Sequence, residues 1–119
     1  MKYDREFLRH LIEYVVACDR AGFDAAASLP DDEYYANRNF SFGSIHNLLV
    51  HQMIAQKTWL RRWKGEAFVG RLENQIEHPT RDLLRDRWTK AHAELLDFVS
   101  SQTNDSLNKE MSVRRGAGE

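Results

Sequence analysis

The chain has 119 residues, 42% of them hydrophobic and 29% charged, which suits one globular domain spanning residues 1–119. Seventeen lysines and arginines face 18 aspartates and glutamates, giving a net charge of −1. The chain therefore has no excess positive charge with which to bind a phosphate backbone, and we expect no nucleic-acid partner.

The sequence shows no segment suited to a membrane or to export. Residues 39–56 form the longest stretch without a charged side chain, but they include several polar residues and fall short of the roughly 20 apolar residues that span a bilayer. Acidic and basic residues interrupt the first 13 positions, unlike a signal peptide. The single cysteine, Cys18, cannot form a disulfide within the chain. These features predict a cytoplasmic protein with no membrane partner.

A first long helix is predicted over residues 4–29, because apolar residues recur there at steps of three and four. Pro30 ends the pattern, since proline lacks a backbone donor and disfavours helix at the preceding residue. Cys18 lies on the apolar stripe, so we interpret it as a buried small hydrophobe and not as a nucleophile. The stripe consists of Phe7, Leu8, Leu11, Val15, Cys18, Gly22, Ala25, Ala26 and Leu29.

A second helix is predicted over residues 45–64, with Ser44 as its N-cap and Gly65 just beyond its end. Met53, Ile54 and Leu60 lie outside its main stripe, so extra apolar surface is left for a fourth helix or a second copy of the chain to cover. The main stripe consists of Ile45, Leu48, Leu49, Gln52, Ala55, Gln56, Trp59 and Trp63.

A polar loop follows over residues 65–79, and Thr80 is a suitable N-cap for a third helix that ends near residues 100–102. Residues 103–119 offer few core candidates, and we expect a partly disordered tail there. Three long amphipathic helices without an alternating strand pattern predict an all-α helix bundle. The stripe of the third helix consists of Leu84, Trp88, Ala91, Leu95, Phe98 and Val99.

Five histidines are the main candidates for a functional site. His46 and His51 are five residues apart, about 140° around a helix, so the two rings do not converge on one ion. His51 lies at the flank of its helix's stripe, which suits a metal ligand facing a cleft between helices and equally suits an ordinary interfacial histidine. His10, His78 and His92 show no ligand spacing, and no catalytic residue can be assigned, so enzyme activity stays open at this point.

Three segments resemble, in their order, the DinB/YfiT-like family: LPDDEY at residues 29–34, FSFGSIHNLLVH at 40–51 and WLRRWKGE at 59–66. Pro79-Thr80, Leu84, Arg87-Trp88 and residues 94–98 extend the resemblance over nearly the whole chain. It implies three long helices of an up-down-down-up four-helix bundle, commonly a homodimer. Many members bind a divalent metal through one histidine on the second helix and an H-x-x-x-H pair on the last.

The resemblance makes His51 the counterpart of the first of those metal ligands, for zinc or nickel. The other two histidines have no counterpart, and residues 118–119 resemble the turn before the family's final helix. We therefore expect a C-terminally incomplete domain and an incomplete metal site. The family name refers to an expression pattern, induction by DNA damage. The resemblance implies no nucleic-acid chemistry.

Two functions remain open from the sequence. One is a divalent-metal-binding protein, a metal-dependent thiol transferase or hydrolase that acts on a small thiol or electrophilic small molecule. Its site would join His51 to His92, to His10 or to a partner chain. The alternative is a non-catalytic, degenerate or truncated helical dimerisation module. In either case we expect a homodimer, with Met53, Ile54 and Leu60 in the interface across from the first helix.

Overall fold

The computed structural model describes residues 4–66 and 77–108, and every regular element in those residues is a helix. The elements in chain order are α1 (Arg5–Ala27), α2 (Asp31–Tyr34), α3 (Ile45–Trp63), α4 (Arg81–Ser101) and α5 (Asn104–Leu107). The all-α bundle with three long helices is thus confirmed. The short helices α2 and α5 were not predicted. A capping box between Thr103 and Ser106 begins α5, and residues 109–119 of the predicted tail lie outside the described residues.

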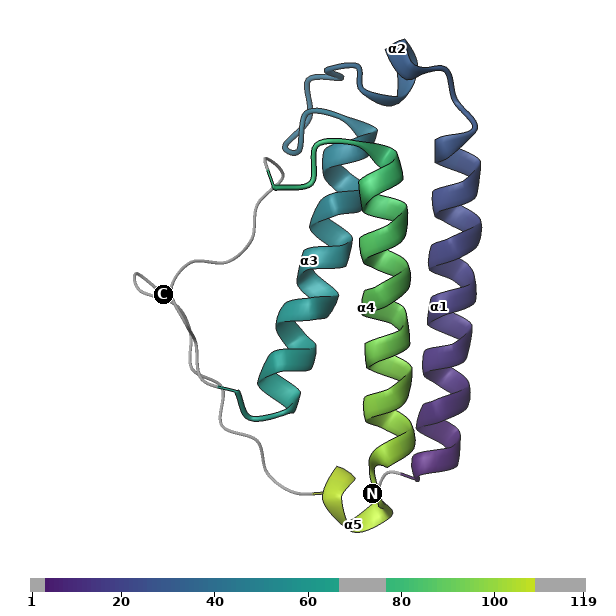
Figure 1. The fold of residues 1–119 in the computed structure, drawn as a ribbon, viewed down its shortest axis with the longest axis vertical. Coiled ribbons are helices and arrows are strands. Elements are labelled where there is room, and N and C mark those ends of the chain that lie inside the picture. Colours follow the sequence, from purple (N-terminus) through teal and green to yellow (C-terminus); the bar gives the residue numbers. More distant parts are fainter. Residues whose placement is uncertain (1–3, 67–76, 109–119) are drawn as a thin grey trace.

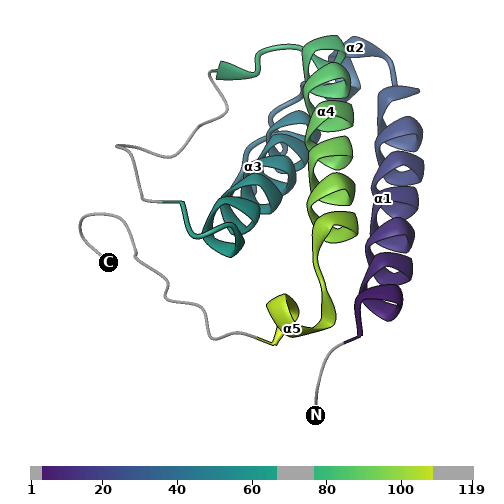
Figure 2. The same ribbon diagram turned by 60° about the horizontal axis from the view of Figure 1, so that its bottom comes forward.

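The three long helices stand side by side, with α4 in the middle. α4 packs against both α1 and α3, and Figures 1 and 2 show it between them from two directions. α1 runs up in Figure 1 whereas α3 and α4 both run down, so the first three helices follow the up-down-down order. The short α2 lies at the upper end of the bundle and α5 at the lower end.

Side-chain caps begin the long helices where the sequence predicts. Ser44 accepts a hydrogen bond from the backbone N–H of Asn47, and Thr80 accepts one from Leu83. Each cap satisfies a helix donor that has no partner within its helix. Gly65 follows α3 with φ of +77°, a left-handed conformation that glycine adopts without a Cβ clash.

The core centres on α4, whose buried face matches the predicted stripe. Leu84, Trp88, Ala91 and Val99 are buried. The indole of Trp88 meets Phe23 of α1 edge to face, with ring centroids 6.3 Å apart, an arrangement that adds to the gain from burial. α4 therefore supplies the apolar surface on which the two outer helices pack.

The buried face of α3 differs from the predicted one. Met53, Ile54 and Leu60 are buried, so their assignment to a dimer interface is wrong. Trp59, expected in the core, is 54% exposed. The apolar residues of α3 cover more than one side of the helix. The side that contacts α4 is rotated by roughly 100° around the helix axis from the expected stripe, the rotation of one residue.

The first helix shows the same difference. Its buried residues are Val16 and Phe23. The predicted burial of Cys18 is wrong, because Cys18 is exposed. Cys18 belongs to a row along the outside of α1 that we call the outer stripe, in which every member is exposed. The outer stripe consists of Phe7, Leu11, Tyr14, Cys18, Ala21 and Ala25.

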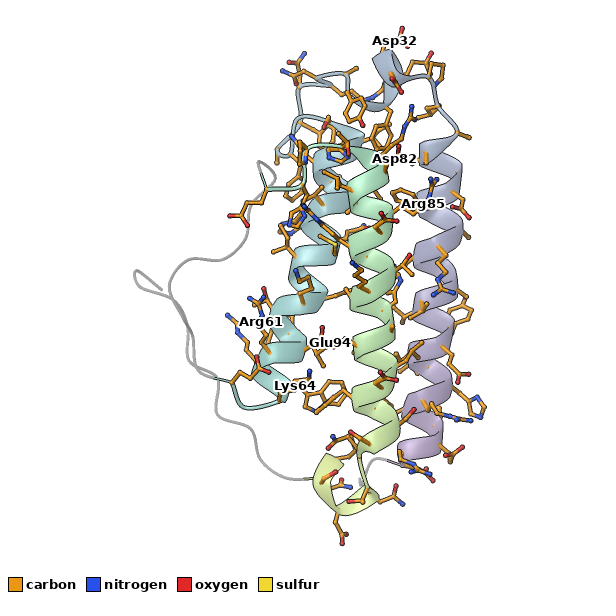
Figure 3. The ribbon with its side chains drawn as sticks, in the orientation of Figure 1. Asp32, Arg61, Lys64, Asp82, Arg85 and Glu94 are labelled. Atoms are coloured by element: carbon orange, nitrogen blue, oxygen red, sulfur yellow. The ribbon has the colours of Figure 1, made fainter. Side chains whose placement is uncertain are left out.

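Arg81, the first residue of α4, connects α4 to α1 and α2 at the upper end of the bundle. Its guanidinium donates to the carbonyl oxygens of Ala27 and Leu29, at 2.9 and 2.8 Å, and pairs with the Asp31 carboxylate. These bonds satisfy the carbonyl of the last residue of α1 and one just beyond the helix. Figure 3 shows Asp32, Asp82 and Arg85 at the same end.

Candidate functional site

His51 lies on the outside of α3. Its side chain is exposed, so the expectation that it faces a cleft between helices is wrong. The imidazole stacks on the ring of Phe42, with centroids 4.5 Å apart and planes 33° apart. His51 comes directly after buried Val50 on a helix that turns about 100° per residue. Its ring is therefore turned away from the core and toward the loop that precedes α3.

The other histidines lie elsewhere and bind other partners. His10 is exposed on α1, with Nδ1 3.8 Å from the Glu13 carboxylate, and His92 is buried on α4 beside Asp19. Within residues 4–66 and 77–108, no three His, Cys, Asp or Glu side chains are placed to hold a metal ion. The described residues offer two exposed imidazoles, His10 on α1 and His51 on α3, and do not form a three-histidine site. Neither His10 nor His92 completes a site with His51 there.

His46 is part of a buried hydrogen-bonded chain at the α2 end of the bundle. Its Nε2 lies 2.7 Å from the carbonyl oxygen of His78, which can only accept, so Nε2 carries the proton. Its Nδ1 then accepts from the Tyr34 hydroxyl, also at 2.7 Å. Burial lowers the pKa of His46 and raises the pKa of Tyr34. Both groups are therefore neutral near pH 7, and both are fully engaged.

His78 continues this chain toward α4. Its Nδ1 lies 2.9 Å from Nη1 of Arg87, and because a guanidinium only donates, Nδ1 is the acceptor. The same Arg87 nitrogen also donates to the carbonyl oxygen of Glu77. These bonds fix the segment that leads into α4 and account for the burial of His46 and His78 in structural terms.

A second polar network crosses the bundle and joins its three long helices. Gln56 of α3 donates from Nε2 to the Asp19 carboxylate of α1 at 2.6 Å and accepts from the Trp88 indole of α4 at 3.1 Å. Nε2 of His92 lies 3.0 Å from the same Asp19 oxygen. Burial lowers the pKa of His92, although the hydrogen bond to Asp19 acts in the opposite direction.

This network was not predicted, although the sequence contains one signal of it. Gln56 is a polar residue within a predicted apolar stripe, and such residues are normally hydrogen-bonded inside the protein. The network pairs an aspartate with a histidine, but its other members are an amide and an indole, neither of which is a nucleophile. The network holds three helices in register.

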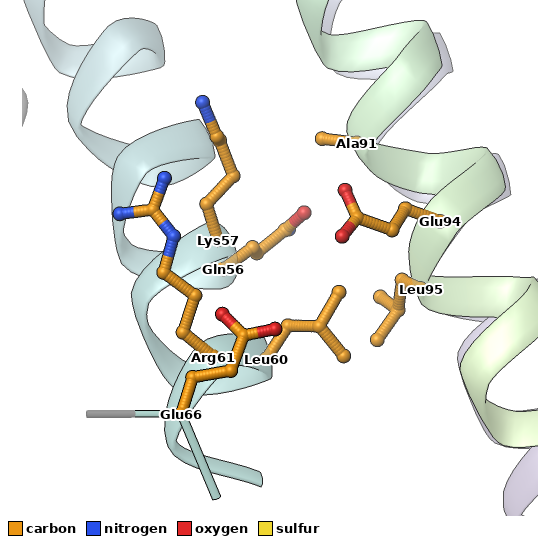
Figure 4. A pocket seen from close by; sticks show the side chains of 8 residues that line it. All are labelled: Gln56, Lys57, Leu60, Arg61, Glu66, Ala91, Glu94 and Leu95. Carbon is orange, nitrogen blue, oxygen red and sulfur yellow. The ribbon is translucent and has the colours of Figure 1, made fainter. Parts of the chain in front are cut away.

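A small hollow opens between α3 and α4 below this network (Figure 4). It holds about 70 Å³, room for roughly two water molecules and far below the few hundred Å³ of a small-molecule site. Glu94, which lines the hollow, forms a 2.9 Å ion pair with Lys64, and Figure 3 shows Arg61 beside them. The lining is Gln56, Lys57, Leu60, Arg61, Glu66, Ala91, Glu94 and Leu95, a mixture of both charges that suits water.

Among the helices of residues 4–66 and 77–108, none combines the length and the apolar character needed to cross a membrane. The sequence model of the DinB family matches residues 2–117. No curated protein and no solved structure matches the chain. The family match extends over nearly all of the 119 residues, and it agrees with the up-down-down order of the long helices. The chain therefore belongs to the DinB family.

Proposed function

We propose that this DinB-family chain is a helical association module that forms a homodimer through the outer stripe of α1. The observation that carries the proposal is the exposure of three large apolar residues in a row. Phe7, Leu11 and Tyr14 are 68%, 46% and 68% exposed, while the opposite side of the same helix packs on α4. Monomeric proteins rarely leave a continuous apolar row of this kind uncovered.

The free energy available from this surface is large enough to drive association. An aromatic side chain buries 150–250 Å² when it is covered, so the exposed parts of Phe7 and Tyr14 together amount to roughly 270 Å² per copy. At about 25 cal/mol per Å², covering them contributes on the order of 7 kcal/mol per copy, before the entropy cost of association is subtracted. After the entropy cost of association is subtracted, enough of this free energy remains for a dimer of moderate affinity.

Metal binding is the second candidate, and the exposed ring of His51 favours it. The imidazole is held against Phe42 and is accessible to a metal ion from solvent. We infer that His51 provides one ligand for zinc or nickel, and that the other ligands come from a second copy of the chain. A thiol transferase or hydrolase activity toward a small thiol or electrophile would depend on those further ligands.

Light scattering coupled to size exclusion tests the association. The wild-type chain at about 50 µM is expected at twice its own 13.9 kDa. The double substitution Phe7→Lys/Tyr14→Lys places four like charges in the interface of a dimer, so it should give a folded monomer. A matched control is Thr89→Lys/Ala93→Lys, at two exposed positions of α4, which should remain dimeric. A monomeric wild type, or an unchanged mass for Phe7→Lys/Tyr14→Lys, would overturn the proposal.

A further inference from the structure

The outer stripe of α1 has two halves that differ in size. Phe7, Leu11 and Tyr14 are bulky and lie toward the N-terminus of the helix, whereas Cys18, Ala21 and Ala25 are small and lie toward its C-terminus. The small half continues to Gly22, where an added Cβ would meet no atom within 4 Å. One half of the stripe therefore projects from the helix and the other half leaves a shallow recess.

We propose that two copies pair α1 against α1 in antiparallel orientation, with the bulky half of each stripe in the small half of the other. The inference rests on the proposed dimer and specifies its geometry. Phe7 and Ala25, Leu11 and Ala21, and Tyr14 and Cys18 are three pairs with the same midpoint, residue 16. A two-fold axis at the height of residue 16 therefore brings all three pairs opposite one another at once.

Packing geometry favours this orientation over the parallel one. Two helices pack with their axes 8–10 Å apart. A parallel pair would set Phe7 against Phe7 and Tyr14 against Tyr14 at one end, and alanine against alanine at the other. The helices would be held apart at the bulky end and a gap would remain at the small end, which loses contact energy. The antiparallel pair gives one large and one small residue at each level, so the separation stays constant.

The same reasoning indicates a second copy as the occupant and not an unrelated protein. The surface that fits the bulky half of the stripe is the small half of the identical stripe, which is the self-complementarity that a two-fold interface requires. α1 has 23 residues, so the covered strip is roughly 35 Å long and 10 Å wide on each copy. The total buried area is then roughly 700 Å², below the roughly 1,000 Å² of a stable specific interface and in the range of a weak, reversible pair. We therefore expect dissociation at micromolar concentrations.

Disulfide trapping tests the geometry, because disulfides form only where Cα atoms are about 4.4–6.8 Å apart. In a Cys18→Ser background the chain has no other cysteine, so cysteines can be placed by substitution. Leu11→Cys/Ala21→Cys should give a covalent dimer on mild oxidation, with a yield about tenfold above that of either single substitution. The reason is that residues 11 and 21 meet across the interface, whereas residue 11 and its own counterpart are separated by about 15 Å along the helix axis.

The single substitutions and light scattering separate a wrong pairing geometry from the absence of a dimer. A covalent dimer with Leu11→Cys alone or with Ala21→Cys alone, as strong as with both, would show a parallel pair and overturn the antiparallel geometry. Absence of covalent dimer from Leu11→Cys/Ala21→Cys would also overturn the geometry if light scattering of the same sample reports a dimer. A monomer by light scattering would instead contradict the proposed dimer itself, and the pairing with it.

Discussion

Nε2 of His92 lies 3.0 Å from the carboxylate of Asp19, and this contact joins α4 to α1 inside the bundle. Only 3% of the His92 side chain and 17% of the Asp19 side chain are exposed. Gln56 of α3 donates to the same carboxylate oxygen. One oxygen of Asp19 therefore accepts hydrogen bonds from both α3 and α4.

Substitution of Asp19 is expected to destabilise the fold. Asp19→Ala leaves the donors of His92 and Gln56 without their acceptor in a largely buried setting, which should lower the free energy of unfolding by roughly 2–4 kcal/mol. The matched control is Asp24→Ala, an exposed position on the same helix, where a change within about 0.5 kcal/mol is expected. Urea denaturation measures both. Equal stability of the two variants would show that the network contributes little.

Stability is expected to fall in acid because of His46. The folded pKa of His46 is lowered by burial, so the folded state favours neutral imidazole and the unfolded state binds the proton more readily. The stabilisation is therefore complete above the unfolded pKa, about 6.5, and is lost as the pH falls toward the folded pKa. The groups near the ring are Tyr34, Tyr35 and the His78 carbonyl.

Denaturation at several pH values checks this expectation. Between pH 7 and 5, the free energy of unfolding of wild type should decline with a slope of up to about 1.4 kcal/mol per pH unit for each such histidine. His46→Gln should be less stable at pH 7 and should show a smaller slope. His10→Gln, at an exposed position, should leave the slope unchanged. A slope that His46→Gln does not alter would mean that other groups, such as His92, control the acid response.

The position of the core on α3 can be tested by truncation. Met53 is fully buried whereas Trp59 is 54% exposed. Met53→Ala should therefore cost roughly 2–5 kcal/mol through lost burial and the cavity it leaves, and Trp59→Ala should cost less than about 1 kcal/mol despite the larger side chain. Thermal melts decide between the two faces of the helix, and the reverse order of stabilities would contradict the buried face described for α3.

Metal binding can be examined with the two exposed histidines as a matched pair. A single imidazole gives only a small part of the affinity of three converging ligands. If a second copy of the chain supplies the remaining ligands, zinc binding should depend on His51 and not on His10. Calorimetric titration of His51→Ala and His10→Ala measures this dependence. Equal zinc affinity for both variants would remove His51 from any site, because its substitution would then be without effect.

The sequence predicted the helices well but their buried faces only in part. The apolar residues of α4 form one narrow stripe, so the period of the pattern identifies its buried side. In α1 and α3 apolar residues cover more than one side, and periodicity cannot tell which side meets α4. Phe7 and Trp59 were expected in the core for this reason, and both are more than half exposed.

The site was harder to predict than the fold. Capping residues such as Ser44 act on their neighbours in sequence, so local patterns reveal them. Local patterns do not reveal the partners of His92 and His51. Asp19 lies 73 residues from His92, and Phe42 lies in a loop without a regular period. Such contacts depend on how the helices and loops pack, which one sequence does not specify.

Sedimentation equilibrium of the wild type and of Gly22→Leu tests the central claim, self-association through α1, most directly. Gly22 has open space where a side chain would begin, and replacing a helical glycine should stabilise the monomer by about 0.5–1 kcal/mol. The added side chain would, however, fill the recess that receives the second copy. The weight-average mass of wild type should rise from 13.9 kDa toward twice that value between roughly 1 and 100 µM. The mass of Gly22→Leu should stay at 13.9 kDa, with a melting temperature no lower than that of wild type at the lowest concentration. A wild type that remains monomeric throughout, or a Gly22→Leu variant that dimerises as well as wild type, would contradict association through this face.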